Sequence, residues 1–391
     1  QRLNLNPDFP IITVGGTNGK GSVCAMLESM LHAAGYRVGC YTSPHLLDYN
    51  ERVRIAKRQA SDAELCVSFE KIEQARGDAP LTYFEFGTLA AMQLFIENKV
   101  EVAILEVGLG GRLDAVNMFD GDCAVVVSVD IDHTDYLGET RDQIAFEKAG
   151  IFRKGKVSVF GDRDMPAIIA SEAHRIGASL WSLGDQFGYK ASAQQWDFIG
   201  VNGARNALPY PALRGAYQLN NASASLAVLD ALKEKLPVSM GAVRRGLVEV
   251  QLAGRFHVIP GRPQLILDVA HNPHAARSLA QNLAILPPCH HTFAVFAMLR
   301  DKDMAGVAAV LDPNIDTWLV AGIDEPRGAT TDALAQVLRQ NGVRGRVQTF
   351  NNITEAVSYA YNAAGENDRI IVFGSFYTVA EVMYARGLSV T

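Results

Sequence analysis

A chain of 391 residues exceeds the size at which single hydrophobic cores usually stop growing, so the sequence predicts two domains. Hydrophobic residues make up 48% of the chain and charged residues 20%, a balance that excludes a disordered or fibrous protein. The formal net charge of -6 argues against broad nucleic-acid binding, so small-molecule substrates are the expected partners.

The spacing of the cysteines and the length of the apolar runs indicate the cellular compartment in which the protein is expected. The five cysteines are widely spaced and form no C-x-x-C pair, which indicates neither a zinc knuckle nor a disulfide framework and favours a reducing cytoplasm. No apolar run approaches the roughly 18 to 20 residues that span a bilayer, and no charged-then-apolar leader opens the chain. We expect a cytoplasmic protein without membrane partners and, because Gln1 rather than Met stands first, a chain trimmed at its start.

In the first half of the chain, short β-branched runs alternate with amphipathic stretches, a pattern typical of a parallel sheet covered by helices. "FPIITVGG" is the first expected strand, and apolar residues at helical spacing from Val23 to Ala34 predict a helix that Gly35 ends. Further strands are expected at "YRVGCYTS", "VEVAILEVG", "DCAVVVSVD" and "KGKVSVFGD". Helices are expected over Phe84–Glu97 and Thr140–Ala149.

The second half begins with an irregular stretch. The polar, turn-rich residues 179–211 predict small antiparallel strands, and a helix is expected over Asn220–Glu234. "VEVQLAGRFHVIPGRP" has few helix signals, so we place a boundary near Gln251. Strands followed by helix patterns then return at "QLILDVA", "TFAVFAM", "DTWLVAG", "RVQTF" and "DRIIVFGS". The prediction is an α/β protein, with a parallel-sheet domain over 1–251 and a smaller Rossmann-like α/β domain over 252–391.

"ITVGGTNGKGSVCAML" places a glycine-rich turn between the first strand and the first helix. A phosphate-binding loop reads G-x-x-x-x-G-K-[ST], but Val14 stands here at the first glycine position and Gly21 separates Lys20 from Ser22. The context still favours a phosphate site, because the N–H groups of such a turn, the helix dipole and Lys20 would together hold an anion. The alternative is a tight strand-to-helix turn with a solvated lysine.

Three motifs, "GTNGKGS", "YTSPHL" and "DVAHNPHA", occur in the order found in one family. The chain resembles the Mur-ligase-like folylpolyglutamate synthases, including bifunctional dihydrofolate synthase/folylpolyglutamate synthases, over essentially its whole length. The resemblance implies an ADP-forming, P-loop ATPase domain joined to a smaller C-terminal domain. It also implies ligation of L-glutamate to dihydropteroate and to reduced folates through an acyl phosphate, with ATP, one or two Mg²⁺ ions and a monovalent cation as cofactors.

The resemblance also implies roles for individual residues. For ATP it implies Gly16, Thr17, Asn18, Gly19, Lys20, Gly21, Ser22, Asn221, Arg255 and Asp268. As Mg²⁺ ligands it implies Ser43, Glu106 and His133, each expected after a strand, where ligands bind in open α/β sheets. Lys148 of "FEKAGIF" would be carbamylated by CO₂, which requires a neutral amine and therefore a lowered lysine pKa. Lys20, Lys148 and His271 are the catalytic candidates.

Structural alternatives exist for several of these residues. Glu106 could cap the turn that follows it, and Lys148 could pair with Glu147 on a solvated helix face. Arg255 could form a surface ion pair. Asn220 stands next to Asn221 and is the alternative to it.

"LTYFEFGTLAAM" combines aromatic and polar side chains. Phe84 and Phe86 offer flat faces for a fused ring beside polar groups, a mixture typical of small-molecule pockets, although both rings could instead face the core. By resemblance the pterin pocket consists of Thr82, Tyr83, Phe84, Glu85, Leu113, Asp114 and Ala115. His271 and Ser375 are implied on the side of the incoming glutamate. The family has more chain before the first strand, including a segment that helps hold the pterin, so we expect part of that contact set to be missing.

Three rivals remain. A muramoyl-peptide ligase shares the fold, but such enzymes carry an additional N-terminal domain for the UDP sugar, for which we expect no stretch here. A monofunctional folylpolyglutamate synthase and a P-loop regulatory protein without ligase activity are the others. A monomer with small-molecule substrates and without nucleic acid is expected.

Overall fold

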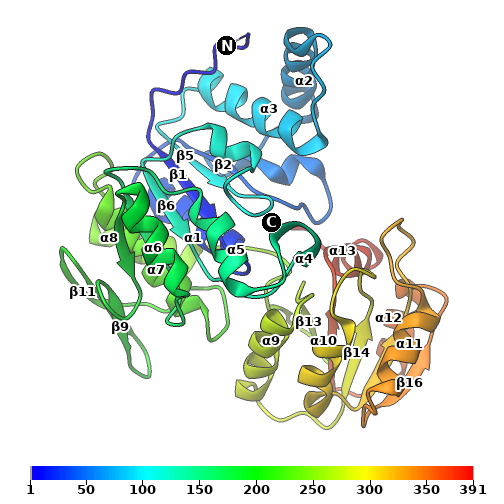
Figure 1. Cartoon of the computed structure of the whole chain (residues 1–391). Coiled ribbons are helices and arrows are strands. Elements are labelled where there is room, and N and C mark those ends of the chain that lie inside the picture. Colours follow the sequence, from blue (N-terminus) through cyan, green and yellow to red (C-terminus); the bar gives the residue numbers. More distant parts are fainter. Residues whose placement is uncertain (1, 391) are drawn as a thin grey trace. The chain divides into compact units, whose positions relative to one another are not determined.

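The computed structural model describes residues 2–390 and divides the chain into two compact units (Figure 1). The first unit runs to Ala212 and resumes over Gln218–Val250. The second consists of Leu213–Tyr217 and the chain from Gln251 onward. Within the second unit, the N–H of Ala216 donates to Asn282 Oδ1 at 2.9 Å, which fixes the short early segment to the later chain.

The first unit is built on an eight-stranded sheet in the order β4-β3-β2-β5-β1-β6-β7-β8. The six strands from β2 to β8 in this order run parallel, and β3 and β4 are an antiparallel edge. The strands are β1 (Ile11–Gly15), β2 (Val38–Tyr41), β3 (Val53–Ile55), β4 (Arg58–Gln59), β5 (Val102–Glu106), β6 (Cys123–Val126), β7 (Val157–Phe160) and β8 (Ser179–Ser182). β1, β2, β5 and β6 are buried along their whole length, as expected for strands covered on both faces.

Helices cover both faces of this sheet. The helices are α1 (Lys20–Ala33), α2 (Asp62–Arg76), α3 (Tyr83–Glu97), α4 (Thr134–Leu137), α5 (Arg141–Ala149), α6 (Ala167–Ile176), α7 (Gln218–Ala231) and α8 (Met240–Glu249), with 3₁₀ turns η1 (Tyr49–Arg52) and η2 (Ala115–Met118). Apolar residues of α3, α5 and α6 form one core cluster with the sheet, and α2 packs on α3 (Figure 1). The helix that follows the phosphate-loop motif, α1, packs against α7 and α8.

Two expectations need correction in this unit. Ser179–Ser182 is not part of a separate antiparallel group, because the crossover helix α6 returns the chain in the same direction and β8 pairs in parallel with β7. The antiparallel strands that follow are β9 (Gly188–Ala191), β10 (Trp196–Gly200) and β11 (Gly203–Leu208). The start of the stretch with few helix signals is helical, since α8 continues to Glu249 from the N-cap Ser239.

The second unit has a six-stranded sheet in the order β12-β13-β17-β14-β15-β16, parallel except for β12. Its strands are β12 (His257–Ile259), β13 (Gln264–Leu267), β14 (Thr292–Phe296), β15 (Thr317–Val320), β16 (Arg346–Thr349) and β17 (Arg369–Phe373). Its helices are α9 (Pro273–Ile285), α10 (Met304–Leu311), α11 (Thr331–Gln340), α12 (Ile353–Ala363) and α13 (Phe376–Ala385), with the 3₁₀ turn η3 (Asp312–Asn314). Residues of α9, α10 and α11 share one core cluster with the sheet.

The contact between α1 and α8 depends on a glycine. A Cβ on Gly246 would lie 2.5 Å from Met30 Cα and 2.7 Å from Met30 N, both backbone atoms that cannot move without shifting α1. We expect Gly246→Ala to lower the free energy of unfolding by about 1–3 kcal/mol and to lower the Tm, because overpacking outweighs the better helix propensity of alanine.

Gly241→Ala in the same helix is the matched control, since its nearest neighbour would be Ser239 Oγ at 3.9 Å. Thermal unfolding of both variants tests the prediction. Equal melting temperatures for the two variants would contradict close backbone packing at Gly246.

No helix within residues 2–390 has the length and hydropathy needed to cross a membrane.

Candidate active site

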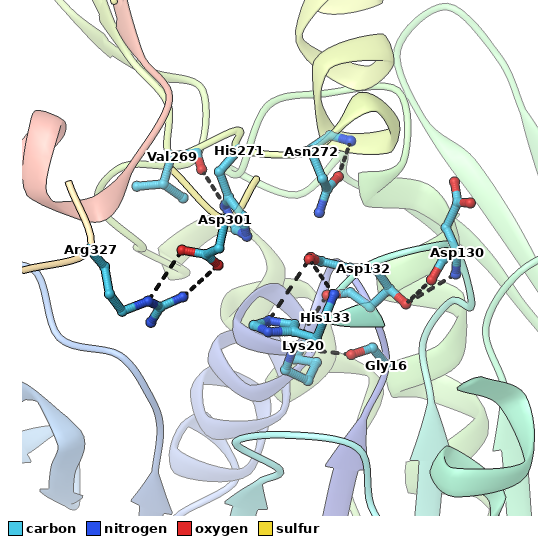
Figure 2. A network of polar contacts seen from close by, with 12 residues as sticks. Gly16, Lys20, Asp130, Asp132, His133, Val269, His271, Asn272, Asp301 and Arg327 are labelled. Atoms are coloured by element: carbon cyan, nitrogen blue, oxygen red, sulfur yellow. Dashed lines mark hydrogen bonds and ion pairs between the residues drawn. The ribbon is translucent and has the colours of Figure 1, made fainter. Parts of the chain in front are cut away.

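The glycine-rich turn after β1 is held in one conformation by backbone contacts. Gly16 and Gly19 have φ values of 145° and 86°, which residues with a Cβ rarely adopt. The N–H of Thr17 donates to the Ser128 carbonyl at 2.8 Å. The Lys20 ammonium donates to the carbonyls of Gly16 at 3.1 Å and Thr17 at 3.3 Å, so its charge lies on the turn and not out in solvent (Figure 2).

The N-terminus of α1 directly follows this turn. The helix begins at Lys20, and among the described residues no side chain caps its N-cap, Gly19. Free N–H groups and the positive end of the helix dipole attract anions. Gly21 belongs to the first helical turn, and Ser22 is buried with its Oγ 3.4 Å from the Gln218 amide.

The structure separates the two neighbouring asparagines of α7. A Cβ on Gly19 would lie 2.8 Å from Asn221 Oδ1, so Asn221 lies directly against the glycine-rich turn. Asn220 instead accepts a hydrogen bond from the Tyr189 hydroxyl at 3.0 Å. Asn18 is fixed on the other side, where its N–H donates to Ser128 Oγ at 3.1 Å.

Two of the three expected metal ligands lie together. Glu106 ends β5 and is buried, and its Oε2 accepts a hydrogen bond from the Ser43 N–H at 3.1 Å. β2 and β5 are parallel neighbours, so the ends of both strands meet at one sheet edge. The third, His133, has its ring Nε2 4.0 Å from Asp132 Oδ1. Its backbone N–H donates to the same oxygen at 2.8 Å (Figure 2).

Hard oxygen donors of this kind suit Mg²⁺. Across residues 2–390 no group of three or more His, Cys, Asp or Glu side chains is arranged to hold a metal ion. A cation here would therefore need Ser43 or further oxygen atoms, such as those of a nucleotide, beside Glu106. Glu106 is a carboxylate at a strand end and can supply such oxygen ligands.

Lys148 lies inside the protein and not on a solvated helix face. Its residue is 4% exposed, and burial together with the charge of Lys20 lowers the pKa of its amine to about 7, while Asp132 and Asp114 oppose the shift. Its neighbour Glu147 pairs with Arg112 at 2.9 Å. The alternative of a Glu147–Lys148 surface pair is therefore wrong, and burial of Lys148 favours the neutral form of its amine.

The polar groups at the start of α3 are used by the helix itself. Thr82 is its N-cap and accepts from the Glu85 N–H at 3.2 Å, while Glu85 Oε2 accepts from the Thr82 N–H at 2.7 Å and its hydroxyl at 2.8 Å. These bonds form a complete capping box. These hydrogen bonds lower the pKa of the Glu85 carboxyl, and the largest part of this shift comes from the backbone hydrogen bond of Thr82.

The aromatic residues of this stretch differ in exposure. Phe84 stacks on Tyr41 with ring centroids 5.7 Å apart and packs against Gly108, where a Cβ would lie 2.7 Å from its Cζ. Tyr83 is 65% exposed and Leu113 80% exposed, so both present apolar surface to solvent. Such surface is available to a ligand.

Asp114 shapes the turn that contains Leu113. Its Oδ2 accepts from the Leu109 N–H at 2.8 Å and its Oδ1 from the Val116 N–H at 3.0 Å, where it caps η2, which begins at Ala115. Burial raises the pKa of this carboxyl. The carboxylate oxygen atoms of Asp114 therefore hold this loop in shape.

The second unit carries the remaining candidates. Asp268 follows β13, and its carboxylate accepts from the N–H groups of Phe256 and Ala270, each at 2.8 Å. Burial raises the pKa of Asp268, whereas the charge of Arg255 lowers it. The Arg255 guanidinium lies 4.8 Å from the centroid of Phe376.

His271 and Ser375 also lie in this unit. His271 Nδ1 lies 2.8 Å from the Val269 carbonyl oxygen, which can only accept a hydrogen bond, so this contact orients the ring (Figure 2). Ser375 is buried and caps α13 by accepting from the Tyr377 N–H at 3.2 Å.

Two protein-family models match consecutive parts of the chain. Residues 14–229 match the family described as Mur ligase middle domain, and residues 254–376 match Mur ligase, glutamate ligase domain. The dihydrofolate synthase/folylpolyglutamate synthase of Escherichia coli strain K12 is 45% identical over 379 residues, which covers 97% of this chain and 87% of that protein. The chain belongs to this ligase family.

Solved structures agree with the sequence matches. E. coli FolC in complex with DHPP and ADP is 44% identical, with a TM-score of 0.93 over 99% of this chain and 91% of that one. A bifunctional folylpolyglutamate synthase/dihydrofolate synthase with Mn, AMPPNP and L-glutamate bound is 47% identical, with a TM-score of 0.92 over 99% of this chain and 92% of that one. The predicted family, the two-part α/β fold and the class of ATP-dependent ligase are confirmed.

Sequence reasoning missed several residues that hold the glycine-rich turn in place. Thr17 Oγ1 and the backbone of Asp130 exchange hydrogen bonds at 3.0 and 3.1 Å, and Ser128 holds Asn18 on both its N–H and carbonyl sides. The signal was available in part, because "VVVSVD" ends the strand β6 that pairs with β1. Residues after neighbouring parallel strands meet at one edge.

Proposed function

We propose that this chain catalyses amide-bond formation between L-glutamate and dihydropteroate, and that it adds further glutamates to reduced folates. ATP and a divalent metal ion are required, and ADP and phosphate are released. The observation that carries the proposal is the glycine-rich turn with Lys20 folded over it, in a chain that matches dihydrofolate synthase/folylpolyglutamate synthases over nearly its whole length.

The chemistry follows from the low reactivity of a carboxylate toward an amine. A carboxylate oxygen of the acceptor first attacks the γ-phosphorus of ATP, which gives an acyl phosphate and ADP. The amine of glutamate then attacks the acyl carbon, loses a proton and expels phosphate. Both steps gather negative charge, so positioned cations and N–H donors lower the barrier.

We assign the groups that stabilise negative charge in the first step, the phosphorylation of the carboxylate, to the first unit. The turn Gly16–Ser22 and the N-terminus of α1 hold the phosphates, Lys20 supplies positive charge, and Asn221 lies beside the turn. Ser43 and Glu106, which lie together, would hold the divalent ion, with His133 as the third proposed ligand. When bound, this ion supplies countercharge to the phosphate oxygens.

We propose that Lys148 is carbamylated and acts as an anion on the metal side of the site. The amine is suited to the reaction, since a pKa of about 7 leaves neutral amine to attack CO₂. In the second unit we assign Arg255 and Asp268 to ATP, and His271 and Ser375 to the incoming glutamate.

We assign the binding of the acceptor's pterin ring to the residues near the start of α3 and in the turn before η2. Phe84, Tyr83 and Leu113 supply apolar surface, while Asp114 and the capping-box residues Thr82 and Glu85 give the turns their shape. The proposed domains are 1–251 and 252–391. The proposed compartment is the cytoplasm, which suits five free thiols, and the monomer stays a prediction.

A panel of acceptors tests the proposed function. The protein is incubated with ATP, Mg²⁺, L-glutamate and either dihydropteroate or tetrahydrofolate, and phosphate release and product mass are followed. We expect one ATP consumed per glutamate added and dihydrofolate formed from dihydropteroate.

Two outcomes would change the proposal. Extension of tetrahydrofolate without any dihydrofolate would leave a monofunctional folylpolyglutamate synthase. Nucleotide binding with no glutamate-dependent ADP release from any acceptor would favour a regulatory P-loop protein.

A further inference from the structure

Arg54 on β3 forms hydrogen bonds with four residues from three other segments of the first unit. Its side chain is 19% exposed, and its Nε lies 3.1 and 3.0 Å from the two carboxylate oxygens of Glu28, which is 6% exposed. Its Nη2 donates to Cys40 Sγ at 3.2 Å. Planar guanidinium groups are suited to such multiple contacts, because their five donors point in fixed directions.

One nitrogen of this guanidinium joins the two ends of a loop. Nη1 donates to Thr42 Oγ1 at 3.1 Å and to the Glu51 carbonyl at 2.8 Å. Thr42 immediately precedes Ser43, and Glu51 lies at the far end of the segment that leads back to β3. The Thr42 N–H donates to the Arg52 carbonyl at 2.9 Å, so entry and exit are held together twice.

The side-chain carboxylate of Glu51 holds the interior of the loop. Its carboxylate accepts from the N–H groups of Leu46 at 2.9 Å, Leu47 at 2.6 Å and Asp48 at 2.8 Å. Charge-assisted bonds of this length are strong. The loop is therefore rigid within itself, and its placement relative to β5 depends on how Thr42 and Glu51 are anchored.

That anchor connects both proposed ligand sites of the first unit. Glu28 lies on α1, the helix whose N-terminus follows the glycine-rich turn, and it holds the guanidinium. On the other side, the Ser43 N–H reaches Glu106 Oε2 at 3.1 Å. Arg54 thus links the phosphate-binding helix to the strand end where the cation is proposed.

We propose that Arg54 is a positioning residue for the divalent cation, because it fixes Thr42 and thereby keeps Ser43 beside Glu106. This inference rests on the proposed cation site at Ser43 and Glu106. In this proposal the effect of Arg54 passes through the loop, by way of its bonds to Thr42 and Glu51. Loss of such a supporting contact costs about 10- to 100-fold in metal affinity at other sites.

Arg54→Lys is the main test. Lysine keeps the positive charge that pairs with Glu28, but a single ammonium cannot also reach Thr42 and the Glu51 carbonyl in the same geometry. We expect the affinity for Mn²⁺ with AMPPNP, measured by isothermal titration calorimetry, to fall about tenfold. The affinity for ADP in excess EDTA should stay within about twofold of the parent, because the phosphate loop keeps its own contacts.

The matched control is Arg58→Lys on the neighbouring strand β4. The Arg58 side chain forms an exposed pair with Glu64 and donates to the Gln59 carbonyl, both outside the loop over residues 43–51. Arg58→Lys should leave the affinities for Mn²⁺ with AMPPNP and for ADP in EDTA unchanged. Thr42→Val is the second variant, since it removes the hydroxyl that Arg54 binds and leaves the Arg54–Glu28 pair intact.

Kinetics give a further readout. We expect the KM for Mg²⁺ to rise about tenfold in Arg54→Lys and Thr42→Val, with kcat at saturating Mg²⁺ within about threefold of the parent. A general structural defect would instead weaken metal-free ADP binding as much as Mn²⁺·AMPPNP binding, and that result would overturn the proposal. Unchanged Mn²⁺ affinity in both folded variants would also overturn it.

Glu106→Gln separates this inference from the proposed function. If Glu106→Gln retains full affinity for Mn²⁺·AMPPNP, the cation site itself is wrongly placed and both proposals fall. If Glu106→Gln loses that affinity while Arg54→Lys and Thr42→Val keep it, only the role of Arg54 is refuted.

Discussion

Replacing Lys20 by alanine should reduce ligation by about 10³-fold or more in kcat/KM, because the variant loses the positive charge next to the proposed β- and γ-phosphates. The fold should persist, since the turn is held by main-chain contacts such as the Thr17 N–H to the Ser128 carbonyl. The measurement is glutamate-dependent phosphate release at saturating ATP, together with thermal unfolding of the purified variant.

Lys154→Ala is the control for this experiment, because Lys154 is an exposed lysine outside the turn. It should ligate at the parent rate. If Lys20→Ala also ligates at nearly the parent rate, Lys20 is a surface residue and the phosphate loop is wrongly assigned.

A second consequence of Lys20→Ala concerns Lys148. The charge of Lys20 is one of the causes that lower the pKa of the Lys148 amine. Removing it should raise that pKa, and less of the amine would then be neutral and able to react with CO₂. Part of the lost activity should therefore come from reduced carbamylation, which carbon NMR after ¹³C-bicarbonate labelling would detect.

Lys148→Ala should be nearly inactive, with a loss of about 10²-fold or more, because it removes the proposed anion from the metal side of the site. A short carboxylic acid such as acetate should partly restore activity by occupying the vacated space. In the parent protein a carbamate carbon signal should appear on adding labelled bicarbonate and disappear in the variant. Unmodified Lys148 in a metal- and nucleotide-bound crystal, together with normal activity of Lys148→Ala, would refute the modification.

The pKa of Lys148 also makes stability depend on pH. The folded-state pKa of about 7 lies below the ordinary lysine value of 10.5, so between these pH values the unfolded chain binds more protons than the folded one. The free energy of unfolding of the unmodified protein should therefore rise with pH across this window. Lys148→Met, measured by denaturant unfolding without CO₂, should remove that part of the rise and be more stable than the parent at pH 6.

Elements that depend on local signals could be predicted from the sequence. The runs "VAIL" and "LIL" within "VEVAILEVG" and "QLILDVA" are apolar at every position, which is typical of strands covered on both faces, so β5 and β13 were predicted correctly. The capping box of Thr82 and Glu85 is also a local pattern, T-x-x-E before an apolar run, although its meaning for the pterin assignment was missed. α8 was missed because Gly241 and Gly246 lower its helix propensity and its buried face contains few large apolar residues.

The sequence also limited the chemistry. A glycine-rich turn, a lysine and a helix N-terminus in direct succession make an anion site by geometry that is local to a few residues. The identity of the ligase family depended on three motifs far apart in the chain, which the sequence presents in order without showing where they lie in space.

Only the tertiary structure decided between alternatives that depend on distant neighbours. Lys148 and Glu147 are adjacent in the chain, yet Glu147 turns to Arg112 while Lys148 is buried near Lys20, and this burial is what lowers its pKa. Asn221 lies against Gly19 and Asn220 against Tyr189 because consecutive helical residues point about 100° apart. Arg54 carried no local signal at all: its partners Glu28, Cys40, Thr42 and Glu51 come together only when α1, β2 and β3 pack, since burial and charge pairing are properties of the folded arrangement.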